Sequence, residues 1–215
     1  ETGYGIAMLI PLGKLILSVA GATALFICVV ALIASLFTGI NFFHVIRALK
    51  DILFLAFSTA SSEAALPGAM KRLEELGVPK TIVTFVMPTG YSFNLDGSTL
   101  YSSAGILFIA QLYGIQMPIE QQLLVMVTLM LSTKGIAGVP GAGIIVVAAT
   151  AAAFNLPTEG VAILLGIDRL LDMIRTICNV CGNCMATVVV ACWEKELNKA
   201  TFNEKYRAFL GGKNR

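Results

Sequence analysis

The chain has 215 residues, of which 57% are hydrophobic and only 13% are charged, and its mean hydropathy is +0.83. Soluble domains average about 25% charged residues, so this composition disfavours a water-soluble globule and favours a membrane protein. The net charge of +2 is too small to indicate a nucleic-acid partner. The five cysteines lie in apolar stretches, which argues against a secreted disulfide scaffold. The chain opens with neither an initiator methionine nor a signal-peptide pattern, and we expect it to begin inside a longer protein.

The first long apolar segment is predicted to cross a bilayer as a helix. Residues 15–37 carry no charge, and at about 1.5 Å rise per residue they are long enough for roughly 30 Å of hydrocarbon. We place the transmembrane helix at residues 11–38, after an N-terminal flank at residues 1–10. A buried helix of a soluble protein would show the same pattern and is the alternative for this segment taken alone.

Two later apolar segments are interrupted by polar or small residues. In the first, at residues 45–78, the stretch 58–63 separates two short apolar pieces. In the second, at residues 118–156, four glycines and one proline fall within residues 132–143, which excludes a stable helix there. Irregular backbone at membrane depth is tolerated only where it is buried in protein or lines a cavity. We therefore predict two re-entrant helical hairpins whose tips line a transporter site near the bilayer midplane.

Two further segments are long enough to span the bilayer. Residues 80–113 are interrupted around Asn94, Asp96 and Gly97, which predicts a broken transmembrane helix with a buried carboxylate. Residues 160–193 form the last span. Residues 194–215 are charged and amphipathic and are expected to be a solvated end. The predicted fold class is an all-α integral membrane protein.

The basic residues predict the orientation of the chain. If the first span enters the cytoplasm near Gly39, eleven of the fifteen lysines and arginines lie in cytoplasmic segments, as the positive-inside rule expects. The outer loops contain Glu120 and Glu159, and Lys14 is the one basic residue on an outer flank. The C-terminus is then cytoplasmic. Three basic residues fall at membrane depth and require specific partners: Lys134, Arg169 and Arg175.

A helical wheel of the last span gathers its polar side chains on one side. At about 100° per residue, six of them fall within an arc of roughly 100°. They are Asp168, Asp172, Arg175, Thr176, Asn179 and Asn183. Such side chains are very costly against lipid, so this polar stripe must face protein or water.

The chemistry of the polar stripe predicts a receptor for a zwitterion with a second acidic group. Arg175 offers a planar fork that suits a carboxylate. Asp172, one turn away, can accept a hydrogen bond from an ammonium group. An internal Asp–Arg ion pair that only locks helices together is the alternative.

Cys178, Cys181 and Cys184 have a CxxCxxC spacing that could indicate an iron–sulfur or zinc site. On the wheel they point away from the polar stripe, spread over about 120° and have no fourth ligand nearby. We interpret them as small packing residues and predict no metal site. The lone histidine, His44, lies in the connector after the first span and is expected to be solvated or to cap a helix.

Four motifs, in this order, closely resemble the dicarboxylate/amino acid:cation symporter family, also called the glutamate transporter family. They are AFSTASSEAALP (56–67), YSFNLDGSTLY (91–101), STKGIAGVPGAG (132–143) and GIDRLLDMIRTICNVCGN (166–183). The resemblance covers about residues 11 to 194, and the branch it most resembles is that of the bacterial glutamate/aspartate:proton symporters.

In that family these segments form most of a transport domain that moves substrate by an elevator-like motion. The resemblance implies that residues 11–193 are a partial transport domain and that the chain is the C-terminal half of a transporter. The earlier helices supply a scaffold through which a homotrimer is expected. The resemblance further implies a multi-pass protein of the inner (plasma) membrane that is not an enzyme and carries no organic cofactor.

The resemblance also implies roles for single residues. Arg175 would hold the side-chain carboxylate of the substrate, and Asp172 its amino group. Neutral hydrogen bonds would come from Ser98, Thr176 and Asn179. The hairpin tips would enclose the α-carboxylate through Ser61, Ser62 and the backbone near Val139 and Gly143. In the family, an aspartate at the position of Asp172 favours amino acids over C4-dicarboxylates.

Several residues of this chain differ from those of the sodium-coupled members of the family, and these differences bear on the identity of the coupling ion. Those members resemble this chain at Asn94, Asp96 and Asn179, where side chains and carbonyls ligate sodium. Here the second carboxylate of the last span is replaced by Asn183, and Lys134 places a fixed cation near a sodium position. The methionine of the sodium branch's NMDGT motif is also replaced, by Leu95. Each departure weakens a sodium site.

A different acid, Glu63, lies at the expected tip of the first hairpin. Burial at membrane depth would allow this carboxylate to pick up and release a proton. We therefore predict coupling to H⁺ through Glu63, with Na⁺ as the alternative ion. A structural pairing of Glu63 with Lys134, Arg169 or Arg175 is the other interpretation.

These inferences predict a secondary active transporter that imports L-glutamate or L-aspartate by proton symport with an elevator mechanism. Its partners would be the acidic amino acid and the lipid bilayer. One alternative is a sodium-coupled symporter of acidic amino acids or C4-dicarboxylates. The others are a membrane fragment that only associates with a partner half, and a membrane redox protein built on the cysteines.

Overall fold

The computed structural model describes residues 2–134 and 140–212, and each regular element in these ranges is an α-helix. The elements are α1 (Thr2–Thr38), α2 (Phe42–Ala48), α3 (Lys50–Thr59), α4 (Ser62–Glu75), α5 (Lys80–Phe93), α6 (Asp96–Leu112), α7 (Ile119–Ser132), α8 (Ala142–Ala153), α9 (Glu159–Trp193) and α10 (Lys199–Gly212). The all-α architecture predicted from the sequence is confirmed for this part of the chain.

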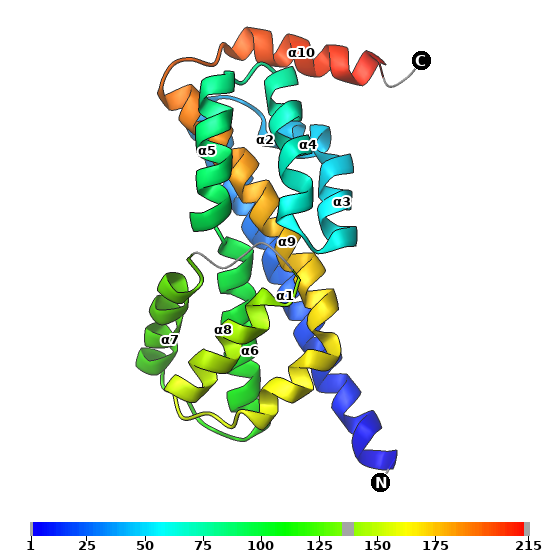
Figure 1. Cartoon of the computed structure of the whole chain (residues 1–215), viewed down its shortest axis with the longest axis vertical. Helices are drawn as coiled ribbons and strands as arrows, with labels where there is room; N and C mark the ends of the chain where they lie inside the picture. Colours follow the sequence, from blue (N-terminus) through cyan, green and yellow to red (C-terminus); the bar gives the residue numbers. More distant parts are fainter. Residues whose placement is uncertain (1, 135–139, 213–215) are drawn as a thin grey trace.

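Two long helices organise the structure (Figure 1). Within the described residues, Leu9–Thr38 and Glu159–Trp193 are long and apolar enough to cross a membrane. They differ in their surroundings, because α1 exposes much of its apolar surface whereas α9 contacts α1, α3, α4, α5, α6 and α8. The helix α9 is therefore the central element against which the shorter helices pack.

The first helix begins earlier than the sequence predicts. It starts at Thr2 instead of Pro11, so most of the expected N-terminal flank is helical. Proline removes one backbone donor and is usually a helix boundary. Pro11 lies inside α1, and such a proline is tolerated in membrane helices because other groups satisfy the freed carbonyl.

The three predicted interruptions are present as helix ends. The α3–α4 pair and the α7–α8 pair lie at opposite ends of the molecule, and the break between α5 and α6 lies at the level between them (Figure 1). The turn after α3 is made by Ala60, whose φ of 50° is left-handed. Ser61 then caps α4, because its side chain accepts a hydrogen bond from the Ala64 amide at 3.3 Å. Short polar residues thus set where the helices stop.

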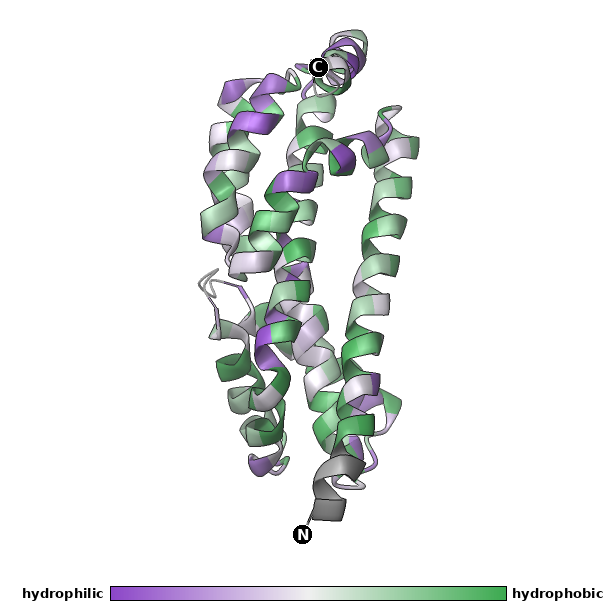
Figure 2. Ribbon diagram, turned by 90° about the vertical axis from the view of Figure 1, so that its right-hand side faces the viewer, coloured by the Kyte–Doolittle hydropathy of each residue, from purple (hydrophilic) through white to green (hydrophobic). Residues whose placement is uncertain are grey.

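The buried apolar side chains form two clusters instead of one. One joins α2–α5 and α10 to the C-terminal half of α9, and includes Phe42, Leu73 and Val188. The other joins α6–α8 to the N-terminal half of α9, and includes Ile106 and Leu164. The helices are mostly apolar along their length, with polar residues interrupting at mid-height (Figure 2). The polar stripe of α9 therefore runs between two apolar cores.

The C-terminal segment is largely exposed, as its charged and amphipathic sequence predicts, but one face of it packs on the rest of the chain. Residues 199–212 form α10, which lies across one end of the molecule (Figure 1), and Phe202 and Tyr206 on this helix are buried. His44 is half-buried, and its ring stacks on Tyr206 with centroids 4.3 Å apart. Apolar residues spaced four apart on an otherwise charged helix form a face that packs on α2.

Candidate functional site

The six polar side chains predicted to share one side of the last span are all buried. Asp168, Asp172, Arg175, Thr176, Asn179 and Asn183 are each no more than 7% exposed. The prediction that this stripe faces protein is therefore confirmed by the geometry. The roles that the resemblance implies for these residues stay a prediction.

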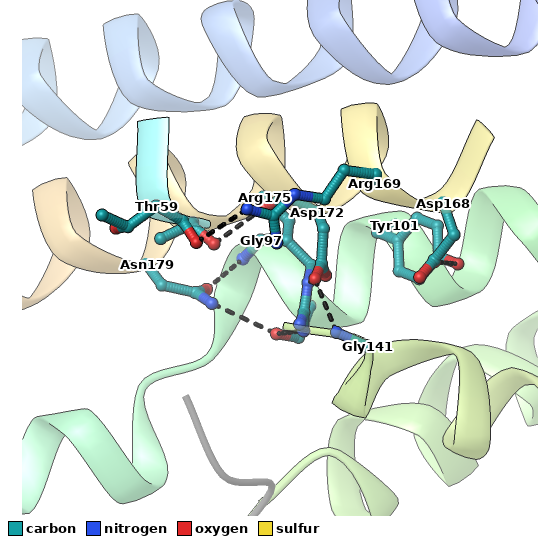
Figure 3. Close-up of polar contacts among 11 residues, drawn as sticks. Thr59, Gly97, Tyr101, Gly141, Asp168, Arg169, Asp172, Arg175 and Asn179 are labelled. Atoms are coloured by element: carbon teal, nitrogen blue, oxygen red, sulfur yellow. Dashed lines mark hydrogen bonds and ion pairs between the residues drawn. The ribbon is translucent and has the colours of Figure 1, made fainter. Parts of the chain in front are cut away.

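Arg175 and Asp172 form an ion pair at the centre of the site (Figure 3). Arg175 donates from Nε to Asp172 Oδ1, one helical turn away on α9. It also donates from Nη1 to Ser98 Oγ at 2.9 Å, and Ser98 lies in the first turn of α6. The buried guanidinium thus faces a carboxylate on its own helix and a hydroxyl at the start of a broken helix.

Asn179 joins α9 to the start of α6 through two hydrogen bonds. Its Nδ2 donates to Ser98 Oγ at 3.1 Å, and its Oδ1 accepts from the Gly97 amide at 2.9 Å. The approach is close, since a Cβ on Gly97 would overlap the backbone carbonyl oxygen of Arg175 and lie 2.7 Å from Cys178 Cβ. Thr176 instead donates to the Asp172 backbone carbonyl at 2.7 Å. The side chains of Arg175 and Asn179 therefore both lie within hydrogen-bonding distance of Ser98, while the roles of these three residues toward a substrate stay a prediction.

The ends of both helix pairs reach the same stretch of α9. From the α7–α8 pair, the amide of Gly141 donates to Asp172 Oδ2 at 2.7 Å. From the α3–α4 pair, the carbonyl of Thr59 accepts from Arg169 Nη2 at 3.2 Å. Figure 3 shows both contacts on one side of α9. Elements from opposite ends of the molecule thus converge within four residues of the central helix.

Tyr101 belongs to the site and was not assigned a role by sequence reasoning. Its side chain is fully buried, and its hydroxyl donates to Asp168 Oδ1. A Cβ on Gly143 would lie 3.0 Å from the Tyr101 ring and 3.1 Å from Arg175 Nη1, so α8 also approaches here. The available signal was the three-residue spacing from Ser98, which places both side chains on one face of α6.

Three of the predicted ion-coupling residues form a second polar cluster beside the first. With the two side-chain amides oriented so that donors meet acceptors, Asn94 donates to Asp96 Oδ2 at 2.7 Å. Asn183 donates to the Gly90 carbonyl at 3.2 Å and contacts the Asn94 amide at 3.1 Å. A Cβ on Gly90 would lie 2.5 Å from the Asn183 amide. The end of α5, the break and α9 therefore meet in this cluster.

The remaining predicted residues are placed less centrally. The expected burial of Glu63 is wrong for the described chain, because its side chain is exposed on the first turn of α4. The residues of α4 that are buried against the apolar cluster include Ala65 and Ala69. Ser62 is buried and Ser61 is half-buried at the same turn. Val139 lies outside the described residues.

The cysteine interpretation is confirmed for packing. Cys178, Cys181 and Cys184 are free thiols and are buried. Cys181 and Cys184 belong to the apolar cluster around the C-terminal half of α9, and Cys178 abuts Gly97. Their small size permits the close packing of α9 against its neighbours.

The sequence profile described as the sodium:dicarboxylate symporter family matches residues 2–193. The chain belongs to this family. The assignment agrees with the resemblance seen in the four motifs and places the chain among membrane transport proteins rather than enzymes.

Curated relatives of this chain are named for acidic substrates. It is 53% identical over 197 residues to a proton/sodium-glutamate symport protein of Geobacillus stearothermophilus, covering 91% of this chain and 47% of the relative. It is 48% identical over 208 residues to the proton/glutamate-aspartate symporter of Escherichia coli (strain K12), covering 97% and 48%. It is 43% identical over 210 residues to a C4-dicarboxylate transport protein of Burkholderia pseudomallei (strain 668), covering 97% and 48%. The chain spans about half the length of these relatives.

The close approach of α6 to α9 gives a test of the site geometry in this member of the family. Gly97→Ala should destabilise the protein by about 1–3 kcal/mol, because the added methyl group overlaps the Arg175 carbonyl and separates Gly97 from Asn179. Gly166→Ala on α9 is the matched control, since nothing lies within 4 Å of its Cβ. Thermal unfolding in detergent should show a lower midpoint for Gly97→Ala alone; equal midpoints for both variants would contradict the packing described here.

Proposed function

We propose that this chain carries the substrate site of a secondary active transporter that imports L-glutamate or L-aspartate together with a proton. The remainder of the transporter is needed for transport. The proposal is supported by the family assignment, by the names of the relatives and above all by the buried Arg175–Asp172 pair.

The Arg175–Asp172 pair supplies partners for two of the three charged groups of an acidic amino acid, the side-chain carboxylate and the ammonium group. A buried ion pair is stable only where further hydrogen bonds satisfy each partner, and loss of one partner leaves an uncompensated charge. When a substrate carboxylate binds Arg175 and a substrate ammonium group binds Asp172, two ion pairs replace the one between Arg175 and Asp172. Neither buried charge is then left without a partner. Asp172 accepts from Arg175 and Gly141, and a carboxylate has about four acceptor sites, so it retains capacity for an ammonium group.

The same argument favours amino acids over C4-dicarboxylates. A dicarboxylate has the same two carboxylates but no ammonium group, so nothing in it would offset the negative charge of Asp172. C4-dicarboxylates nevertheless form the second candidate class, because a relative named for them is 43% identical to this chain.

The two helix pairs are proposed to act as re-entrant hairpins and as gates. They approach α9 from opposite ends of the molecule, and among the described residues each reaches residues 169–172 with a backbone hydrogen bond, from the Gly141 amide and to the Thr59 carbonyl. Movement of either pair would uncover the site from one end only. This arrangement supports alternating access of the site to the two sides of the membrane. An elevator-like motion of the whole domain would then carry the closed site across.

The second polar cluster favours a proton over sodium as the coupling ion. Sodium requires several oxygen ligands, and in this cluster the Asp96 carboxylate accepts from Asn94 and the Gly90 carbonyl accepts from Asn183, so a bound sodium ion would compete with these amide groups. Among these residues Asp96 is the single carboxylate. The positive charge of Lys134 also acts on Asp96 and opposes a bound cation. We propose Glu63 as the proton carrier, in a position that becomes enclosed when the other half of the transporter is present.

The proposed setting is the inner (plasma) membrane, with several spans and a cytoplasmic C-terminus. Large apolar side chains of α1, among them Leu25, Leu32 and Phe37, are exposed in this chain. We propose that lipid and the other half of the transporter cover them, and that this other half forms a homotrimeric scaffold. The basic residues of α2, α4 and α10 would then face the cytoplasm.

The substrate assignment predicts a change of preference in Asp172→Ser. Loss of the ammonium partner should lower kcat/KM for aspartate uptake about 10- to 100-fold, while succinate uptake falls much less. Labelled uptake by the full-length gene product in liposomes measures both, with Glu120→Gln on α7 as a surface control. An equal loss for the two substrates would indicate that the pair only locks helices together.

The ion assignment predicts that Glu63→Gln uncouples uptake from the proton gradient. The amide cannot carry a proton, so an inward proton gradient should no longer accelerate aspartate uptake, whereas exchange of aspartate across the membrane without a gradient should persist. Glu204→Gln on α10 is the control, because this residue is also exposed. A pH dependence of uptake unchanged from that of the unmodified protein would rule out Glu63 as the carrier.

A further inference from the structure

Arg169 lies outside the buried polar stripe and has no role in the substrate site described above. It follows Asp168 on α9, and its side chain is exposed. Its neighbours have other partners, since Asp168 bonds to Tyr101, and Asp172 to Arg175 and Gly141. Arg169 donates instead from Nη2 to the carbonyl of Thr59, 110 residues away in the chain, at 3.2 Å (Figure 3). Its charge is therefore directed at a backbone group.

Thr59 is the last residue of α3, where a helix leaves backbone carbonyls without intrahelical partners. The neighbouring groups of this turn are satisfied locally, because the Ala60 amide donates to the Phe57 carbonyl at 3.2 Å and Thr59 Oγ1 donates to the Leu55 carbonyl at 2.8 Å. The Thr59 carbonyl takes its hydrogen bond from Arg169. It also lies at the negative end of the α3 dipole, where a cation is favourable.

We propose that Arg169 is a positioning residue that fastens the tip of the α3–α4 hairpin to α9. This inference rests on the proposed function, because it assigns to Arg169 the alignment of Ser61 and Ser62 with the Asp172–Arg175 pair. The tip is held at two points: Arg169 binds the end of α3, and Ser61 caps the start of α4. Ala60 and Ser61 form the two-residue connection between them.

The bond to Thr59 accounts for the presence of a charged side chain at this depth in the membrane. An arginine there is retained when it pairs with an acid or with backbone carbonyls. The contact joins α9 to the hairpin three residues before Asp172, so loosening it frees the tip without touching the substrate-binding charges themselves. The expected effect is weaker substrate binding with little change in the transport step.

The first test is hydrogen–deuterium exchange of the full-length gene product. Arg169→Gln should raise the exchange rate about tenfold in the peptide that contains residues 59–64, whose amides at Ala60, Ser61 and Ala64 are bonded within the turn. Exchange at the α5–α6 break should not change. Arg169→Lys, which keeps the charge and a hydrogen-bond donor group, should give a smaller rise, and Arg47→Gln, at an exposed side chain of α2, should give none.

The second readout is uptake of labelled aspartate by the same variants. Arg169→Gln should raise KM about five- to tenfold with kcat within about twofold, and Arg169→Lys should restore part of the loss. Unchanged exchange at the tip, or an equal rise in exchange along all of α9, would overturn the proposal. Should Arg169→Gln not fold, Arg169→Lys decides the same question by its exchange. If no variant and no unmodified protein takes up an acidic amino acid, the proposed function fails, while the exchange data still decide the role of Arg169.

Discussion

The buried ion pair between Arg175 and Asp172 is the interaction on which the rest of the structure depends. Its side chains are 4% and 1% exposed, and an ion pair withdrawn from water is tolerated only when further hydrogen bonds satisfy its members. Those bonds come from other elements: Ser98 at the start of α6 and Gly141 before α8. A helix must therefore start close to Ser98, and another must start close to Gly141, at the level of one stretch of α9. The breaks in the helices follow from the need to deliver polar groups to this pair.

The helix breaks supply these polar groups because the backbone amides and carbonyls at a helix end have no hydrogen-bond partner within the helix, whereas those in the interior do. The amide of Gly97, the amide of Gly141 and the carbonyl of Thr59 each lie at a helix end, and each bonds to a side chain of α9. Two apolar clusters hold these ends in place from either side of the polar layer. The apolar cores thus provide stability and the layer between them provides chemistry. The proposed opening of the site would break the hydrogen bonds that Gly141 and Thr59 make to α9.

Much of this arrangement could be predicted from the sequence because its signals are local. The uncharged run at residues 15–37, the breaks at Asn94 and at the hairpins, and the polar stripe of α9 are visible in composition and helical period. Contacts between distant segments are different, since a helix face does not specify which turn of another helix it meets. The Tyr101–Asp168 bond joins residues 67 apart, and the Arg169–Thr59 bond joins residues 110 apart. The burial of Phe202 on α10 was not predicted because the segment around it is mostly charged. Glu63 was expected to be buried because its depth in the membrane was inferred from its position at the tip of the first hairpin.

The measurement that tests the account most directly is uptake of labelled aspartate by the full-length gene product in liposomes. An inward proton gradient is imposed without sodium, and in a second experiment a sodium gradient is imposed without a proton gradient. The account predicts uptake under the proton gradient alone. Uptake that requires sodium would contradict the assignment of the ion, and uptake under neither gradient would contradict the assignment of the Arg175–Asp172 pair as a receptor for acidic amino acids.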